Sequence, residues 1–458
     1  MIKKILFISF LSGSSLCNAQ TNPAITKWLF NTTGITGRHY MTGNPTPIAD
    51  ATLANVQQVS YTTTDSYVSA TGIPSHITGP YSLGAVSVAL SNNYVFKILL
   101  NPVANTGVLT SVGMGAIAVF IDGTVAYNNR DAATYNNAGN WHQNAVYFEN
   151  LGFDCAHGHP GPMTSDYHAH QNPTAFNFSS MPTSSVCNVY LADGLYVPDS
   201  SQHGPLIGFA SDGFPIYGAY GYSDPLDTLS EIKRMTSSYH LRNITSRTTL
   251  PNGTAAVGPT FTQMITSMLP GSTPLPAVLG AYSEDFEFVS GSGDLDVHNG
   301  RFCKTPEYPN GIYCYFSTID SLNNPVYPYL IGDTYYGVSA ITGGPGGGNG
   351  YSHATIPSGA TQYNPTTAIK NVDENSLAVN VYTSTDKELL VVQSSMYQPF
   401  DRTVKLINIS GQIIQTSVLY QGSTMCYFNL QTVYPGVYLV QVSSGNKSIV
   451  KKVFVQPN

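Results

Sequence analysis

The sequence predicts a mainly β protein, in which a large irregular β-rich domain is followed by a small C-terminal β-sandwich. Charged residues make up only 10% of the 458 residues, well below the usual quarter. The polar character comes instead from Ser, Thr, Asn, Gln and 31 Tyr residues, which favour strands and turns over long charged helices. The length exceeds that of one ordinary core, which predicts more than one domain.

Residues 1–19 have the composition of a signal peptide. Two lysines precede an apolar run from Ile5 to Leu11, and Cys17-Asn18-Ala19 offers a cleavage site of small residues. The apolar run is too short to anchor the chain in a bilayer. We therefore expect an exported mature chain that begins near Gln20 and has no transmembrane span. The net charge of −7 argues against a nucleic-acid partner, which requires a basic patch.

Five cysteines remain after the signal peptide, and export places them in an oxidising compartment. The shortest pairings are Cys155 with Cys187 and Cys303 with Cys314, and we expect both disulfides. Cys155 also neighbours a histidine cluster, so a metal thiolate is the alternative for this residue. Cys426 is the odd cysteine, and we expect it to be buried as a small hydrophobic side chain.

The large domain is predicted to cover residues 24–340. Short alternating runs separated by turn residues predict strands between about 28 and 101. A hairpin is predicted at 115–129, where Asp122-Gly123 supplies a two-residue turn, and Asn310-Gly311 predicts another.

Two segments of this domain differ from that pattern. PLDTLSEIKRM at 225–235 has early acidic residues, late basic residues and apolar spacing near 3.6, which predicts a short helix. In SEDFEF, Glu284 and Asp285 are carboxylates with the wrong spacing for a calcium loop, so we expect solvated turn residues.

The C-terminal part of the chain changes in composition. GGPGGGNG lies within 341–371, which we interpret as a flexible glycine-rich linker. Residues 372–458 contain strand-like runs at near-regular spacing with turn residues between them, which predicts the small β-sandwich.

The stretch from Asp154 to Pro173, DCAHGHPGPMTSDYHAHQNP, holds four of the eleven histidines in two H-x-H pairs. On an extended strand residues i and i+2 point to the same face, so two such pairs joined by a turn can direct four imidazoles to one point. Imidazole suits zinc and copper. The predicted ligands of a zinc or copper ion are His157, His159, His168, His170 and His203.

Further polar residues are expected to orient these imidazoles. The candidates for such outer contacts are Tyr167, His142, Asp212 and Asp154. The alternative is that the histidines bond loop backbone and only stabilise a Gly/Pro-rich fold.

The C-terminal segment resembles the type A sorting domain of the type IX secretion system. The resemblance covers about 372–455 and rests on Val404-Lys405-Leu406, Ser410-Gly411-Gln412, Pro435-Gly436-Val437-Tyr438 and Lys451-Lys452-Val453. It implies export across the outer membrane by the type IX secretion machinery, followed by release or attachment at the cell surface. An ordinary adhesion module is the alternative.

The large domain resembles the YHYH family over roughly residues 90–335. The motifs that carry the resemblance are Asp122-Gly123, the stretch Cys155–Pro173, GFASDGFPIYGAYG at 208–221, LDVHNGRF at 295–302 and TPEYPNGIYCYF. The sequence departs from the family at Ala169, which replaces the second tyrosine of the motif. Both motif histidines are kept, so a histidine-based site is still expected.

Three functions are compatible with these features. The first is a secreted or cell-surface protein with a transition-metal site, whose ligand is an unknown small molecule or glycan. The second is a non-enzymatic binding or adhesion module in which the histidines are structural. The third is a metal-free hydrolase with a histidine base oriented by Asp154, Asp166 or Asp212, although no Gly-x-Ser-x-Gly nucleophile motif is present. The sequence leaves open whether the protein is an enzyme.

Overall fold

The structure is a computed structural model and describes residues 21–81, 88–161, 165–172, 198–339, 349–365, 379–384, 388–394, 401–421, 423–444 and 447–456. The predicted signal peptide, Cys187 and most of the glycine run lie outside these residues. The fold is mainly β, as predicted. Its named α-helices are single turns: α1 (Pro23–Thr26), α2 (Ala145–Phe148) and α3 (Asn349–Ser352). No helix of the described segments is long and apolar enough to cross a membrane.

A mixed eight-stranded sheet forms the centre of the large domain, in the order β11-β12-β8-β7-β13-β14-β22-β21. Both predicted hairpins are confirmed within it: β7 and β8 turn at Asp122-Gly123, and β21 and β22 pair across the longer loop 304–311, which ends with Asn310-Gly311. The strands are β7 (Ala116–Phe120), β8 (Val125–Tyr127), β11 (Gly158–Pro160), β12 (Tyr167–Ala169), β13 (Leu206–Ala210), β14 (Pro215–Tyr217), β21 (Gly300–Cys303) and β22 (Ile312–Phe316).

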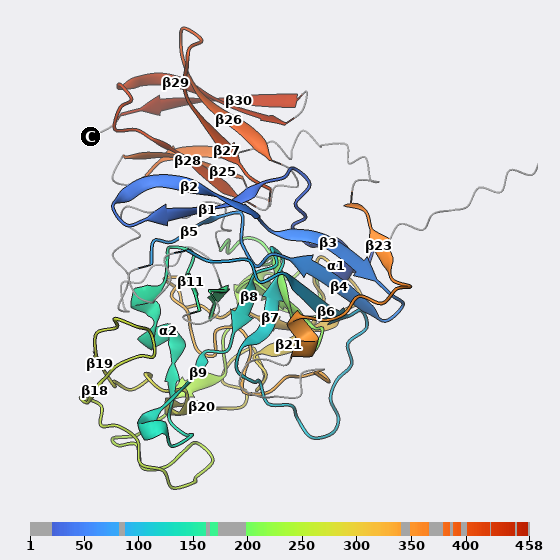
Figure 1. Cartoon of the computed structure of the whole chain (residues 1–458), viewed down its shortest axis with the longest axis vertical. Helices are drawn as coiled ribbons and strands as arrows, with labels where there is room; N and C mark the ends of the chain where they lie inside the picture. Colours follow the sequence, from blue (N-terminus) through green and yellow to red (C-terminus); the bar gives the residue numbers. More distant parts are fainter. Residues whose placement is uncertain are drawn as a thin grey trace, which may run out of the picture.

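Two smaller sheets cover one side of the large domain (Figure 1). The first has the order β23-β3-β4-β6, and the second has the order β2-β1-β5. Their strands are β1 (Thr36–Met41), β2 (Asn44–Leu53), β3 (Val56–Tyr61), β4 (Asp65–Ala70), β5 (Ile77–Thr78), β6 (Tyr94–Leu99) and β23 (Thr361–Tyr363).

The main core lies between the four-stranded and eight-stranded sheets. Val59 and Phe96 from the small sheet pack with Val119 and Phe209 from the large one. Alternate residues of the large sheet point the other way into a second core, where Ile117 and its neighbours meet loop residues 330–335. Burial on both faces explains why β7 and β13 read as continuous apolar runs.

Four two-stranded ribbons extend from this centre. They pair β9 (Arg130–Thr134) with β10 (His142–Asn144), β15 (Tyr220–Tyr222) with β16 (Ile232–Arg234), β17 (Tyr239–Leu241) with β20 (Phe286–Phe288), and β18 (Met264–Ile265) with β19 (Leu275–Pro276). The helix predicted at 225–235 is therefore wrong. Asp224 and Asp227 accept hydrogen bonds from backbone N–H groups two residues ahead, which forms turns, and the following residues pair with β15.

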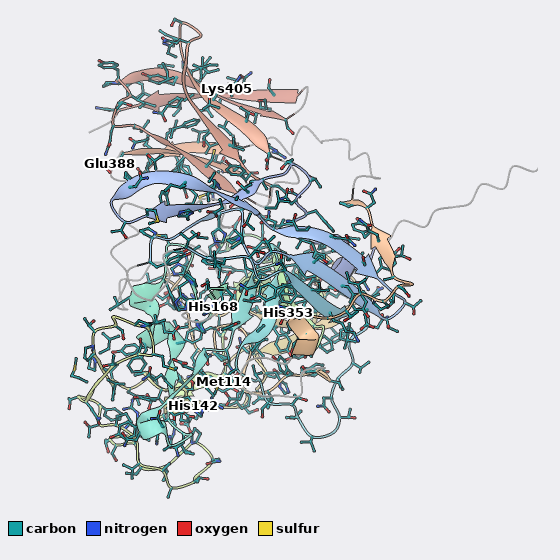
Figure 2. The ribbon with its side chains drawn as sticks, viewed as in Figure 1. Met114, His142, His168, His353, Glu388 and Lys405 are labelled. Carbon is teal, nitrogen blue, oxygen red and sulfur yellow. The ribbon has the colours of Figure 1, made fainter. Side chains whose placement is uncertain are left out.

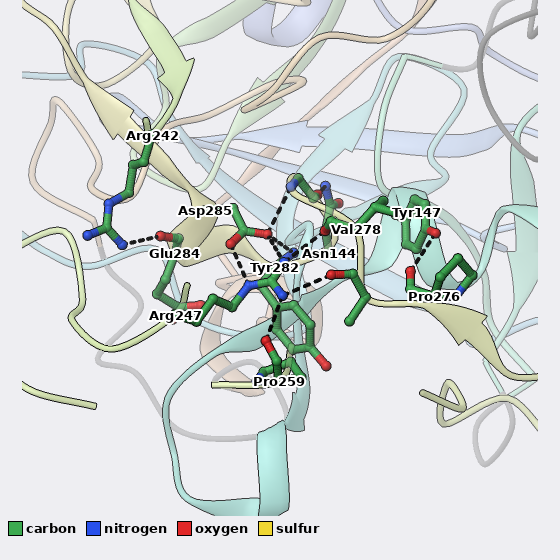
Figure 3. A network of polar contacts seen from close by, with 12 residues as sticks. Asn144, Tyr147, Arg242, Arg247, Pro259, Pro276, Val278, Tyr282, Glu284 and Asp285 are labelled. Carbon is green, nitrogen blue, oxygen red and sulfur yellow. Dashed lines mark hydrogen bonds and ion pairs between the residues drawn. The ribbon is translucent and has the colours of Figure 1, made fainter. Parts of the chain in front are cut away.

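A buried arginine holds the long connection between β17 and β20, residues 242–285, in place (Figure 3). Arg247 donates to both carboxylate oxygens of Asp285 at 2.7 and 2.6 Å, and to the backbone oxygens of Pro259, Ala277 and Val278. Asp285 is fully buried, and Glu284 is nearly so. The expectation of solvated acidic turns is wrong here, because arginine and histidine partners distant in the sequence neutralise these carboxylates.

The C-terminal domain consists of two sheets, with the orders β24-β25-β28 and β27-β26-β29-β30. One apolar core between them includes Cys426, which is 2% exposed. Figure 1 shows this predicted sandwich beside β1 and β2, where the guanidinium of Arg38 lies 4.1 Å from the ring centre of Tyr420. Its strands are β24 (Val379–Thr383), β25 (Leu389–Ser394), β26 (Arg402–Asn408), β27 (Ile413–Leu419), β28 (Met425–Asn429), β29 (Gly436–Ser444) and β30 (Lys447–Val455).

The segment 349–365 differs from a flexible linker. β23 pairs with β3, and Tyr351, which is 2% exposed, donates its hydroxyl to the backbone oxygen of Phe209. The glycine-rich composition of residues 343–350 predicted a flexible linker. The aromatic residues that follow it are instead buried or paired in a strand.

The disulfide predicted between Cys303 and Cys314 is corrected by the structure. Both are free thiols with sulfur atoms 3.1 Å apart, whereas a disulfide bond measures about 2.05 Å. In the β21–β22 register Cys303 faces Ile312 and Cys314 faces Arg301, so the two cysteines are diagonal rather than opposed. The pairing of Cys155 with Cys187 stays a prediction, because Cys187 lies outside the described residues.

Candidate metal centre

The hairpin of β11 and β12 brings one histidine of each H-x-H pair together. His159 and His168 are directly opposed in the antiparallel register, so their side chains share a face of the sheet. Their ring centres are 4.5 Å apart, and both side chains are buried. His168 lies in the interior of the large domain, whereas Lys405 and Glu388 mark the sandwich (Figure 2).

His170 and Glu149 complete a four-residue group. His170 follows β12 by one residue and its ring centre lies 5.0 Å from that of His168. Glu149 caps the C-terminus of α2, just before the short 3-10 helix η2 (Asn150–Gly152). One potential ligand atom from each of Glu149, His159, His168 and His170 lies within 4.8 Å of the others. This is the spacing of donors around a single ion.

The donor atoms lie close together but in poor hydrogen-bond geometry. Glu149 Oε2 lies 3.1 Å from His159 Nε2 and 3.3 Å from His170 Nε2. None of these three buried atoms has a hydrogen-bond partner of acceptable geometry. Buried polar atoms without partners are costly and rare in folded proteins. A cation at the common point would satisfy all three.

The other nitrogen of two imidazoles is held by backbone. His168 Nδ1 lies 3.1 Å from the carbonyl oxygen of Asp166, and His170 Nδ1 lies 2.7 Å from that of Asn128. A carbonyl can only accept, so each Nδ1 carries a proton, and in the neutral ring Nε2 presents a lone pair. This arrangement is typical of metal-binding histidines, which bond their second nitrogen to a carbonyl or carboxylate.

Tyr127 orients His168 from β8. The two rings stack at 4.3 Å with an angle of 23° between them. The Tyr127 hydroxyl donates to the Asp166 carboxylate at 2.5 Å, and the Tyr94 hydroxyl lies 3.3 Å from the same oxygen. Tyr127 thus restricts the His168 ring directly, and Tyr94 from β6 acts through Asp166, whose carbonyl contacts the same ring; both contacts favour a preformed site.

The electrostatics of the group follow from burial and mutual contact. Burial lowers the pKa of His168 to about 3, and the neighbouring histidines add to this effect, so His168 is neutral at physiological pH. Burial also opposes ionisation of Glu149, but contacts with His159 and His170 outweigh it and hold the Glu149 pKa well below its usual value. A carboxylate with a neutral imidazole beside it suits a divalent cation.

A cavity of about 330 Å³ opens beside the four donor residues. Its wall includes Met114, Tyr127, Arg130, Asp131, Met268 and Leu269 in addition to all four donors. Burial, and then the charge of Glu149, raises the pKa of Asp131 to about 7. The cavity gives a small molecule access to the four donors from one side.

Two of the predicted ligands do not join the group. His157 has a φ of 61°, so the extended backbone that would place it on the face of His159 ends before β11 begins. His203 lies against the rings of Tyr217 and Tyr222, at 5.1 and 4.9 Å between ring centres. Neither lines the cavity.

Tyr167 and Asp154 orient the hairpin rather than the imidazoles. The Tyr167 hydroxyl lies 3.1 Å from both oxygens of Asp154, and Asp154 also accepts the N–H groups of Gly79, Ala156 and Gly158. These bonds shape the turn that leads into β11. The effect on His159 is indirect.

The remaining two outer-contact candidates lie elsewhere. His142 Nδ1 bonds the Glu284 carboxylate at 2.5 Å. Asp212 accepts from the Tyr315 hydroxyl at 2.6 Å and from the Gly337 N–H at 2.8 Å. Neither lines the cavity, so each belongs to a separate polar cluster.

Sequence reasoning missed Glu149, Tyr127 and Asp131. The available signal for Glu149 was a single carboxylate in the apolar segment NAVYFENLGF. A charged residue is rarely buried without a partner, so this position pointed to an ion pair or a metal ligand.

Comparison with known families identifies two matches, one in the large domain and one in the C-terminal domain. Residues 95–327, just over half of the chain, match the model of the YHYH protein family. Residues 366–456 match the secretion system C-terminal sorting domain, which indicates export by type IX secretion to the cell surface or the outside. No curated protein matches the chain. The donor group and its cavity fall within the first match, and the chain belongs to the YHYH protein family.

Proposed function

We propose that the protein is an exported metalloprotein whose large domain holds one transition-metal ion through Glu149, His159, His168 and His170. The observation that carries this proposal is the convergence of four buried donors, three of which are otherwise unsatisfied. Among the described residues, no hydrogen bond of acceptable geometry satisfies those three atoms.

The donor set favours zinc or copper. Three imidazole nitrogens and one carboxylate oxygen match ligands that zinc accepts at about 2.0–2.2 Å, and imidazole also suits copper. Calcium and magnesium prefer all-oxygen sites. When bound, such an ion would offer Lewis acidity to a water molecule or a small ligand that enters the cavity.

The sorting domain is consistent with a function outside the cell. The signal for type IX export means that a metal would be acquired or retained in a compartment without cytosolic thiols. A carboxylate and histidines, rather than cysteine thiolates, are donors that an oxidising compartment does not inactivate.

The test is metal analysis of the full chain, purified without a histidine tag, beside a His168→Ala/His170→Ala double variant. His240→Ala is the matched control, because His240 is exposed, lies outside the donor group and bonds the hydroxyl of Ser292. Near-stoichiometric zinc or copper in the parent and the control, with loss in a still-folded double variant, would support the proposal. No metal in the parent after reconstitution would overturn it and favour structural histidines.

A further inference from the structure

The cavity beside the donor group has walls of two different kinds. Met114, Met268 and Leu269 give it an apolar side, whereas the donor residues, Arg130 and Asp131 give it a polar side. Leu269 is 3% exposed and Met268 is 57% exposed. Met268 therefore lies at the open end and Leu269 lies deeper.

Two of the apolar residues, Met268 and Leu269, lie in the loop after β18. This loop belongs to the long connection that Arg247 holds through the oxygens of Pro259, Ala277 and Val278. A wall supported by a buried ion pair is a preformed surface, and preformed pockets avoid the entropic cost of ordering on binding.

The polar side contains atoms with no partner. Asp131 Oδ2 and Arg130 Nε are buried and make no hydrogen bond. The terminal nitrogen of Arg130 lies 3.6 Å from Asp333 and 4.0 Å from Glu284, so its charge is already balanced by carboxylates. Asp131 is thus an available hydrogen-bond acceptor in the cavity, and Arg130 is not an uncompensated cation.

These features select a ligand by size and charge. In liquid water each molecule occupies about 30 Å³, so the cavity of about 330 Å³ has the volume of roughly eleven water molecules. This is enough for one substituted ring. An anion would meet Asp131 and Glu149, and a sugar would leave most of its hydroxyls facing methionine and leucine. The remaining class is uncharged, with an apolar body and at least one hydroxyl.

We propose that the cavity binds a small, uncharged, hydroxyl-bearing ring compound such as a phenol, with the ring against Met114, Met268 and Leu269 and a hydroxyl directed to the metal position and Asp131. This inference rests on the proposed metal centre and specifies its ligand class.

The test uses the full chain loaded with Co²⁺ and the probe 4-methylphenol, with the visible absorption of Co²⁺ as the readout. Methyl β-glucoside and inorganic phosphate serve as the sugar and anion comparisons. We expect 4-methylphenol to change the spectrum with a saturable single-site curve, and the two comparison probes to leave it unchanged.

Two variants test the walls. Met268→Glu places a charge in the apolar wall and is expected to weaken 4-methylphenol binding at least about tenfold. Asp131→Asn replaces one acceptor oxygen with an amide and is expected to weaken binding about tenfold. Met264→Glu is the matched control, because Met264 lies on the same ribbon with the same 57% exposure and does not line the cavity.

The outcomes separate the two proposals. If Co²⁺ binds but 4-methylphenol leaves the spectrum unchanged, the ligand class is wrong and the metal centre stands. If the glucoside or phosphate binds equally well, or Met264→Glu weakens phenol binding as much as Met268→Glu does, the assignment of the walls is wrong. If Co²⁺ does not bind, both proposals are overturned.

Discussion

The most diagnostic perturbation of the proposed centre is Glu149→Gln. Glu149 is the only carboxylate of the donor group, and its Oε2 lies 3.1 and 3.3 Å from two histidine nitrogens. Glutamine keeps nearly the same shape but removes the negative charge. The substitution therefore tests the donor rather than the packing.

The expected magnitude follows from the number of ligands. Structural zinc sites bind with apparent free energies of about 10–16 kcal/mol. Shared equally among the four donors of this group, this is roughly 2.5–4 kcal/mol for each, which corresponds to a loss of about 10² to 10³ in metal affinity.

The assay is competition with a chromogenic chelator at pH 7.5, where the protein and the chelator share a limiting amount of Zn²⁺. His240→Ala controls for adventitious histidine binding, and thermal melts of the metal-free proteins check that Glu149→Gln is folded. An affinity of the folded glutamine variant within about threefold of the parent would refute the assignment of Glu149 as a ligand, since that difference is below 1 kcal/mol.

Three further predictions concern the scaffold, and all are measured by urea denaturation. A Cβ at Gly158 would overlap the buried Tyr167 ring, so Gly158→Ala should lower the free energy of unfolding by about 1–3 kcal/mol; Gly107→Ala, whose Cβ would meet only ordinary contacts, should have little effect, and equal losses would contradict the overlap. Asp285→Asn should cost about 3–5 kcal/mol, because it leaves the arginine partner buried without its counter-charge; a loss under about 1 kcal/mol would contradict this. Burial raises the pKa of Asp212 to about 6 from 3.8, so the folded state binds more protons between these values and stability falls as pH rises through them. The wild type should lose about 2.4 kcal/mol relative to Asp212→Asn between pH 4 and 7, and a gain over that interval would contradict the sign.

The sequence determined the fold class and the location of the site. Low charge, frequent turn residues and short alternating runs follow from local preferences, so they predicted the β architecture and the hairpins at Asp122-Gly123 and Asn310-Gly311. The H-x-H pairs likewise predicted that His159 and His168 would lie on one face, because side-chain alternation is a property of the strand itself.

Tertiary structure decided which residues complete the group. A left-handed backbone conformation at His157 keeps this residue out of the donor group. The alternation of side chains along a strand does not predict such a conformation. Glu149 joins the group from the C-terminal end of α2. His203 packs instead against Tyr217 and Tyr222. The 225–235 helix was likewise overridden by strand pairing with β15. These outcomes depend on contacts between segments far apart in the chain, whose free energies exceed the local preferences that a sequence pattern records.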